Sequence, residues 1–191
     1  MIKRVSIAIS LALVVAALLA GAVFAATLSG TNGPNVIKGT QKSDVIKGLG
    51  GNDKLYGLGG NDRLYGGPED DRLQGDVGND TLLGATGKDT LIGNSGDDLL
   101  EGGEGADRLF GDVGSDRLQA ASGNDFLDAG NDRETDYVYC GSGTDTARIK
   151  VNDVVDGDIS GQSLLDSLNN VTSCETIFVN DIRIPNPLTT K

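Results

Sequence analysis

The sequence predicts an all-β fold, a right-handed parallel solenoid of nine-residue repeats with a small β-rich cap at its C-terminal end. Two observations carry this prediction. A glycine, replaced by Ala120 in the last unit, returns every nine residues, and an aliphatic residue stands seven positions after it in each unit. The composition agrees, because 29 glycines and 4% aromatic residues among 191 suit a thin, repetitive core. Internal repeats of this kind govern the choice of fold.

The repeats run without a gap from residue 30 to residue 128. With glycine as position one, position four is also glycine, except at Lys42 and Glu69. Position six is aspartate in every unit but the first, which has Asn35. Position eight is always leucine or isoleucine. The regular spacing therefore assigns each position in the unit its own structural task.

Elementary geometry turns this spacing into a solenoid. Glycines at positions one and four are expected to allow positive φ and tight bends. Positions seven to nine are expected to form a short strand, with position eight facing inward and its two neighbours facing outward. Two units would then close one flattened coil. Stacked coils would form parallel strands around two facing ladders of leucine and isoleucine.

The aspartates would stack in the same way, because every second unit lies on the same edge of the solenoid. Neighbouring coils would be about 4.8 Å apart. Carboxylates at this spacing repel one another unless a cation lies between them. Carboxylate and carbonyl oxygens without nitrogen or sulfur ligands suit calcium. The sequence thus predicts several Ca²⁺ ions held by Asp53, Asp62, Asp71, Asp80, Asp89, Asp98, Asp107, Asp116 and Asp125.

The repeat Gly-Gly-x-Gly-x-Asp-x-aliphatic-x resembles the RTX, or haemolysin-type, calcium-binding nonapeptide family. The resemblance covers residues 30–128 and, less closely, extends to residue 148. It implies a parallel β-roll with calcium between successive turns, disordered without the ion and folded in extracellular calcium. The second glycine of the family survives only at Gly67 and Gly103, so the other turns are expected to be less pliant. Asn35 and Lys42 put the calcium site of the first coil in doubt, and its units are expected to act as a starting cap.

Two other interpretations of the repeat stay open. The aspartates could form only Asx-turns, in which the side chain bonds to its own backbone. The low aromatic content and high charge would also suit a chain that is disordered in its native state. Both compete with the metal hypothesis, although turn propensity alone does not require one carboxylate at one fixed position in each unit.

The charge and composition exclude several function classes. The chain has 28 acidic and 16 basic residues, which disfavours a nucleic-acid partner. It has no histidine, which removes Ser-His-Asp and Cys-His catalysis and the usual zinc sites.

The first residues have the pattern of a secretory signal peptide, predicted to span residues 1–25. Lys3 and Arg4 precede a long apolar run, and Val23-Phe24-Ala25 fits cleavage before Ala26. The protein is therefore expected to be secreted or held at the cell surface. The alternative is an uncleaved membrane anchor, because the apolar run is nearly long enough to span a bilayer.

The mature chain divides into the roll, residues 26–148, and a C-terminal cap and tail, residues 149–191. In the cap, the sequence predicts strands around residues 148–159 and 173–184 and a short helix in residues 161–170. The two cysteines, Cys140 and Cys174, are expected to form a disulfide that fastens the cap to the roll. The alternative is a pair of buried free thiols.

These features predict an exported, non-enzymatic calcium-binding protein with a structural or surface-interaction role. Arg, Lys and Tyr side chains such as Tyr56 and Tyr65 on the outer faces make a surface glycan or protein a candidate partner, and a calcium-dependent adhesin the alternative function. A plain solvated face explains the same residues. A carbohydrate-active enzyme is a third hypothesis, and a carboxylate pair beside a cleft on one outer face would support it.

Overall fold

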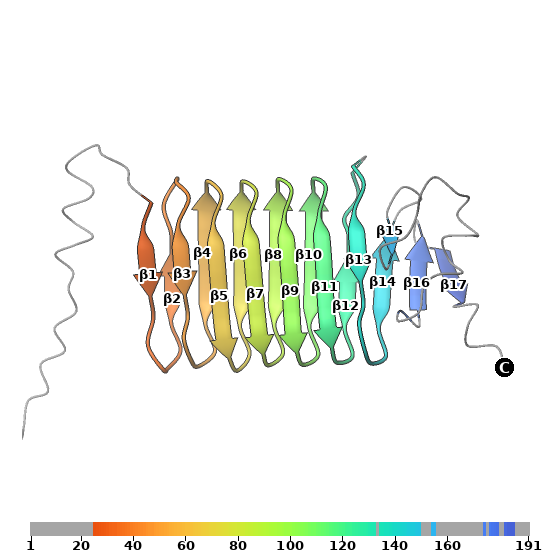
Figure 1. The fold of residues 1–191 in the computed structure, drawn as a ribbon, viewed down its shortest axis with the longest axis horizontal. Helices are drawn as coiled ribbons and strands as arrows, with labels where there is room; N and C mark the ends of the chain where they lie inside the picture. The colour runs from red at the N-terminus through yellow and green to blue at the C-terminus, as the bar shows by residue number, and fades with distance from the viewer. Residues whose placement is uncertain are drawn as a thin grey trace, which may run out of the picture.

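The computed structural model describes residues 25–132, 134–149, 154–155, 174, 176–179 and 182–185, and these residues form a parallel β-solenoid without a helix (Figure 1). Successive strands alternate between two sheets. Sheet A contains, in spatial order, β1 (Thr27–Ser29), β3 (Val45–Lys47), β5 (Arg63–Pro68), β7 (Thr81–Thr86), β9 (Leu99–Glu104), β11 (Arg117–Ser122), β13 (Tyr137–Tyr139) and β15 (Val154–Val155). Sheet B contains β2 (Val36–Lys38), β4 (Lys54–Gly59), β6 (Arg72–Val77), β8 (Thr90–Ser95), β10 (Arg108–Val113), β12 (Phe126–Asp128), β14 (Thr146–Ile149), β16 (Thr176–Val179) and β17 (Ile182–Pro185).

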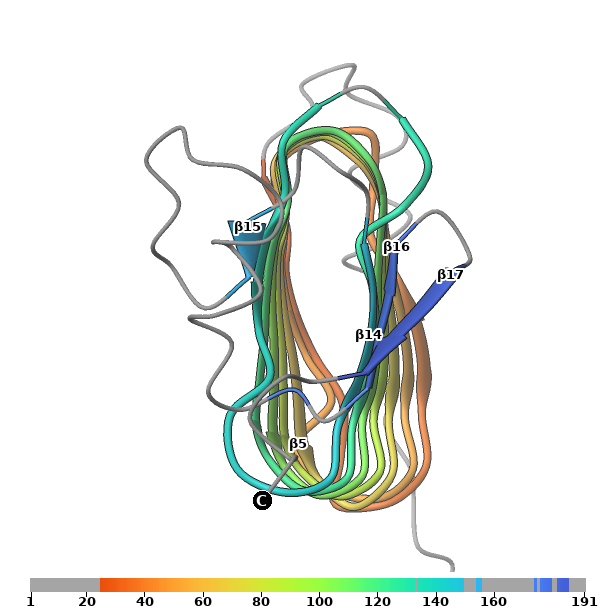
Figure 2. The same ribbon diagram turned by 90° about the vertical axis from the view of Figure 1, so that its right-hand side faces the viewer.

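Figure 2, turned by 90°, shows the two sheets facing each other and joined by turns at both ends of a flattened coil. Within each sheet, strands that are two repeats apart in the sequence pair in parallel, as Leu64 does with Leu82. The spacing between paired residues then becomes longer, because Leu118 pairs with Val138. Additional residues therefore enter the turn between β12 and β13, and the stacking continues beyond them. The predicted coil of two repeats is confirmed.

The core consists of the position-eight side chains alone over most of the solenoid. Each of these residues in the central coils is completely buried, at 0% exposure: Ile46, Leu55, Leu64, Leu73, Leu82, Leu91, Leu100, Leu109, Leu118 and Leu127. At the N-terminal end Leu28 and Ile37 are only partly buried, because no coil covers them on one side. The two inner ladders predicted from the sequence are thus present, and they are one side chain deep in each sheet.

The central strands are longer than predicted. They run from position seven to position three of the next unit, as in Lys54–Gly59. The backbone of positions two and three also pairs between coils, as Gly59 does with Val77. The glycines at position one therefore lie inside strands, where the sequence had suggested a bend.

The positions with positive φ also differ from the prediction, which named positions one and four. They are positions two and four, and position two adopts this conformation even without glycine. The non-glycine examples at position two are Leu49, Leu58, Asp76, Ala85, Asn94, Asp112 and Ala121, with φ between 74° and 95°. From Leu49 onward, the turns that lack the second glycine of the family therefore bend in the same way, at the cost of holding side chains in the left-handed region. Thr31 and Thr40, at position two of the first two units, do not have a positive φ.

The C-terminal segment closes the roll as the cysteines suggested. Cys140 and Cys174 form a disulfide with their Cα atoms 5.4 Å apart, and both residues are fully buried. Strand β16 extends sheet B by pairing in parallel with β14, and β17 pairs with β16 in the antiparallel sense. The strands predicted near residues 148–159 and 173–184 are present where the structure describes them. The predicted helix and residues 1–24 of the predicted leader lie outside the described residues.

Shortening one rung of the ladder should weaken the whole solenoid. Leu91→Ala is expected to lower the free energy of unfolding by about 2.5–5 kcal/mol, because a one-layer core cannot collapse around the cavity. Its neighbour Ile92, on the outer face and only half-buried, provides the matched control. Urea unfolding in saturating calcium would measure both variants, and an equal loss for Ile92→Ala would contradict this account of the core.

The disulfide should contribute to stability independently of calcium. Replacing both cysteines, by Cys140→Ser and Cys174→Ser, removes a cross-link between residues 34 positions apart. The expected loss is about 3–4 kcal/mol in the chain-entropy account of cross-links. Urea unfolding with and without a reductant would measure it, and the double variant should no longer respond to the reductant.

Candidate metal centre

The position-six carboxylates form two buried columns, one along each edge of the solenoid. The column that leads into sheet A contains Asp44, Asp62, Asp80, Asp98, Asp116 and Asp136. The column that leads into sheet B contains Asn35, Asp53, Asp71, Asp89, Asp107, Asp125 and Asp145. None of these aspartates is more than 3% exposed. The described residues include a salt bridge between Arg148 and Asp128, and among them no basic side chain balances the column members from Asp44 to Asp125.

One oxygen of each carboxylate ties its coil to the coil before it. The Oδ1 atom of Asp71 accepts the backbone N–H of Asp53 at 2.7 Å, and the Oδ1 atom of Asp98 accepts that of Asp80 at 2.7 Å. The same contact recurs along both columns, always across one coil. Each position-six residue thus donates one hydrogen bond and accepts another, which fixes the carboxylates in place.

The second oxygen of these carboxylates has no hydrogen-bond partner although it is buried. This holds for Oδ2 of Asp53, Asp62, Asp71, Asp80, Asp89, Asp98, Asp107, Asp116 and Asp125. These are the nine residues that the sequence predicts as calcium ligands. A buried polar atom without a partner is costly and requires an explanation. The most direct explanation is a ligand that binds to it.

The space beside the Oδ2 atoms of Asp53 to Asp116 is the space that glycine at position one of the same unit leaves open, whereas the unit of Asp125 begins with Ala120. A Cβ atom on Gly84 would collide with Oδ2 of Asp89 and lie 2.6 Å from the carbonyl oxygen of Gly102. The carboxylate oxygen and a carbonyl oxygen of the next coil therefore meet above the same glycine. Both atoms are hydrogen-bond acceptors, so neither can satisfy the other. A cation between them satisfies both, which explains why position one needs glycine without a positive φ.

This donor set fits calcium and restricts how it is held. In the described residues, no three His, Cys, Asp or Glu side chains converge on one point. Backbone carbonyls must therefore supply much of the coordination, as they can for Ca²⁺, which takes six to eight oxygens in flexible geometry. Oδ2 atoms of the nine predicted aspartates would provide the charged ligands, and their assignment as ligands remains a prediction.

Burial makes these carboxylates reluctant to ionise when no metal is bound. Desolvation raises the pKa of Asp98 to about 8 and that of Asp89 and Asp116 to about 7. It raises the pKa of Asp62 and Asp71 to about 6. The backbone N–H that each accepts works in the opposite direction, and neighbouring carboxylates add to the rise. The columns are therefore electrostatically strained at neutral pH unless positive charge enters them.

The first coil is built differently, as the sequence had suggested. The side chain of Asn35 accepts the N–H of Thr31 at 2.6 Å. The Oδ2 atom of Asp44 accepts both the N–H and the hydroxyl of Thr40, at 2.6 and 2.9 Å. Here threonine at position two satisfies the oxygen that stays unpaired in later coils. Thr31 and Thr40 at position two are therefore the sequence signal for this bonding, which the position-six residues alone do not reveal.

The aromatic residues do not form one face. Tyr56 lies on β4 in sheet B and Tyr65 lies on β5 in sheet A, so the two residues proposed as glycan contacts lie on opposite sheets. The Nζ atom of Lys38 lies 5.6 Å from the centroid of the Tyr56 ring, and that of Lys47 lies 5.8 Å from the centroid of the Tyr65 ring. These cation–π contacts link neighbouring coils and occupy the rings.

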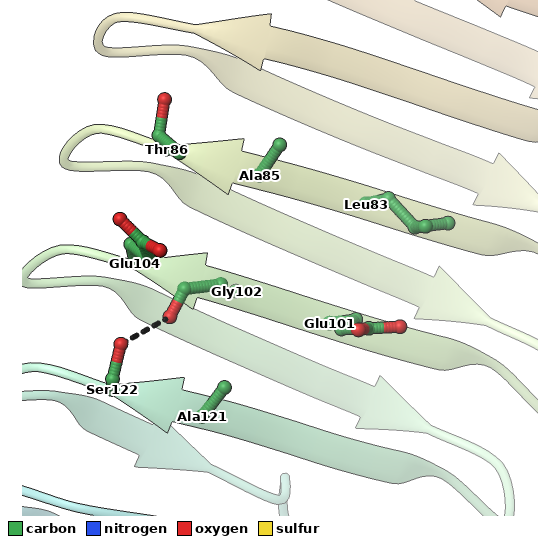
Figure 3. A pocket seen from close by; sticks show the side chains of 9 residues that line it. Leu83, Ala85, Thr86, Glu101, Gly102, Glu104, Ala121 and Ser122 are labelled. Atoms are coloured by element: carbon green, nitrogen blue, oxygen red, sulfur yellow. Dashed lines mark hydrogen bonds between the residues drawn. The ribbon is translucent and has the colours of Figure 1, made fainter.

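The outer surface of sheet A contains a shallow groove of about 340 Å³ across β7, β9 and β11 (Figure 3). Its floor is formed by the small residues Ala85, Gly103 and Ala121. Leu83 and Glu101 line one side, and the side towards the turns is lined by Thr86, Glu104 and Ser122. Both glutamates are exposed to solvent. The sequence analysis did not identify this groove, because it arises from small residues in three separate coils.

Together, the stacked coils and the two columns of buried carboxylates define a repeat protein whose turns are suited to hard cations. The family model for the RTX calcium-binding nonapeptide repeat, four copies long, matches residues 29–64, 56–91, 65–100, 83–118, 101–135 and 110–147. These overlapping matches cover more than half of the chain, which therefore belongs to this family of calcium-binding repeat proteins. No curated protein matches the chain. Among the described residues, no helix is long and apolar enough to cross a membrane.

Proposed function

We propose that this protein is exported, to the medium or the cell surface, and that calcium entering its turns drives the roll to fold there. The observation that carries the proposal is the set of nine buried Oδ2 atoms without hydrogen-bond partners. Extracellular calcium modules typically bind in the range of about 10⁻⁴–10⁻³ M. A chain of this kind would remain unfolded before export and fold outside the cell. Its role there is structural or interactive, and the proposal assigns it no catalytic activity.

Far-UV circular dichroism of the chain from Ala26 to Lys191, titrated with calcium and separately with magnesium, tests this function. The expected result is a cooperative gain of β signal with calcium only, reversed by a chelator. Calcium rather than magnesium should drive folding, because calcium tolerates flexible coordination by many oxygens, whereas magnesium requires a tighter octahedron. A chain that is folded from the start and unchanged by calcium would leave a solenoid of Asx-turns and refute the proposal.

A second candidate function is calcium-dependent binding of a surface glycan, and the groove on sheet A is the observation that favours it. Exposed carboxylates of Glu101 and Glu104 could accept sugar hydroxyls, while Leu83 and Ala85 offer apolar contact. Glycan-array binding in calcium should then be lost in the variant Glu101→Gln with Glu104→Gln. Since Tyr56 and Tyr65 lie on opposite sheets, the single variants Tyr56→Ala and Tyr65→Ala would show which face takes part.

The same two glutamates also bear on the enzyme hypothesis, since they form a carboxylate pair beside a hollow on one face. A general acid in glycoside hydrolysis normally needs a carboxyl group buried against apolar surface. Both Glu101 and Glu104 are exposed instead. The proposal therefore keeps the groove as a binding surface, and release of reducing ends from a polysaccharide panel would contradict it.

A further inference from the structure

The array of position-six contacts begins two units, or one coil, earlier than the aspartates do. Ala26 stands at position six of the incomplete unit before Gly30. Its backbone N–H donates to Oδ1 of Asp44 at 2.6 Å, and its carbonyl oxygen accepts the N–H of Val45 at 2.8 Å. Asp44 in turn donates its N–H to Oδ1 of Asp62 at 2.7 Å. Ala26 is therefore the first residue of the column that leads into sheet A, although it has no carboxylate of its own.

Asp44 differs from the later aspartates of that column because both of its carboxylate oxygens accept hydrogen bonds. Thr40 donates twice to Oδ2, and Ala26 donates to Oδ1. The residue is only 1% exposed, and within the described part of the chain no lysine or arginine pairs with it. Burying a carboxylate is costly unless hydrogen-bond donors or an opposite charge compensate for it. Three neutral donors surround Asp44, and no cationic side chain of the described residues does.

Cleavage of the signal peptide would place a positive charge beside Asp44. Val23-Phe24-Ala25 predicts cleavage between Ala25 and Ala26, which turns the amide nitrogen of Ala26 into an α-ammonium group. That nitrogen is the atom that already lies 2.6 Å from Oδ1 of Asp44. We propose that signal cleavage creates an ion pair between the new N-terminus and Asp44, so that the chain end, and not calcium, closes the first coil. This inference rests on the proposed export of the protein.

The physical gain comes from replacing a neutral donor by a charged one in the same place. Hydrogen bonds to an ionised donor are shorter and about twice as strong as neutral ones. The first coil needs such a fastening, because Leu28 and Ile37 are only partly covered and the end of a solenoid requires a cap. A chain that retains its leader would lack the ion pair, so its first coil would open more readily than that of the processed chain.

A double-mutant cycle tests the ion pair. The chain from Ala26 to Lys191 is compared with the same chain acetylated at the α-amino group, each with Asp44 and with Asp44→Asn. Acetylation keeps the N–H donor and removes only the charge. Urea unfolding in calcium should show an equilibrium about tenfold less favourable after acetylation when Asp44 is present, and a change of less than about twofold with Asp44→Asn.

An equal effect of acetylation in both backgrounds would overturn the inference. If Asp44→Asn does not fold, a chain that begins at Ala25 replaces it, since it keeps the amide donor and moves the ammonium group one residue away. That chain should lose the same tenfold, and no loss would refute the ion pair. N-terminal sequencing of the exported protein must find Ala26. Another first residue would refute the inference while leaving the calcium titration, and with it the calcium-driven folding, unaffected.

Discussion

Without calcium, the roll is expected to be folded near pH 5 and largely unfolded near pH 8. The reason is the raised pKa of its buried carboxyls, about 8 for Asp98 and about 7 for Asp89 and Asp116. In the unfolded chain these groups titrate near their ordinary value of 3.8. The metal-free fold therefore holds protons that the unfolded chain has released, and its stability falls as the pH rises from about 4 through the folded-state values.

Calcium reverses this dependence, because only the ionised carboxylate is a ligand for it. Binding to the folded, protonated roll should release protons between pH 6 and 8, and the calcium concentration that half-saturates the folded roll should rise as the pH falls. Circular dichroism at pH 5 and pH 8, with chelator and with calcium, would measure all four states. A metal-free chain that gains no β signal on acidification would show that the carboxylates do not oppose folding.

One substitution separates this effect from the general loss of negative charge in acid. Asp98→Asn mimics the protonated carboxyl, so at pH 8 it should stabilise the metal-free fold by about 1–3 kcal/mol. The same change should destabilise the calcium-loaded fold, because a ligand is lost. Glu101 is exposed on the outer face of β9, so Glu101→Gln changes the charge equally without entering the column and should alter neither state by more than a few tenths of a kcal/mol.

Gly105→Ala is expected to be among the most damaging single substitutions in the turns. Gly105, at position four, has φ 144°, and a Cβ atom there would overlap the carbonyl oxygen of Gly87 in the preceding coil. Backbone strain and steric overlap together should lower the free energy of unfolding by about 2–5 kcal/mol. They should also raise the calcium concentration needed for folding, because the distorted carbonyl faces the space between turns.

The matched control is Ala85→Gly, at position two on the same edge. Ala85 already has φ 95°, so removing its Cβ relieves strain while it increases the entropy of the unfolded chain. These effects oppose each other, and the change should stay within about 1 kcal/mol of the parent. Calcium titrations and urea unfolding of both variants would check this, and a comparable loss in Ala85→Gly would show that positions two and four are equally constrained.

The nine-residue period was enough to predict the two sheets, the pairing across two repeats and the inward leucines, because each follows from alternation along a strand. It was also enough to predict which carboxylates form the columns. The role of each glycine was not predictable, since the sign of φ depends on how the turn packs on its neighbours. Leu58 has φ 80° without being glycine, whereas Gly84 is glycine because a side chain there would collide with a neighbouring carboxylate.

Other features depend on which coil a residue joins. Tyr56 and Tyr65 stand in consecutive repeats and therefore lie on different sheets, which follows from the period once two repeats close one coil. The bonds of Thr40 to Asp44 and the groove over Ala85, Gly103 and Ala121 arise from contacts within a turn or across three coils. Such contacts are set by side-chain packing, which the repeat pattern does not specify.

The pairing of each strand only with the strands one coil away has a mechanical consequence. Leu73 is paired with Leu55 before it and Leu91 after it, so a coil can leave the end of the stack without disturbing the remainder. Under tension, each detached coil would replace about 4.8 Å of solenoid by an extended segment of about 60 Å. With calcium between its turns as proposed, the roll would thus resist stretching coil by coil, and a drop in calcium would lengthen it severalfold at the same force.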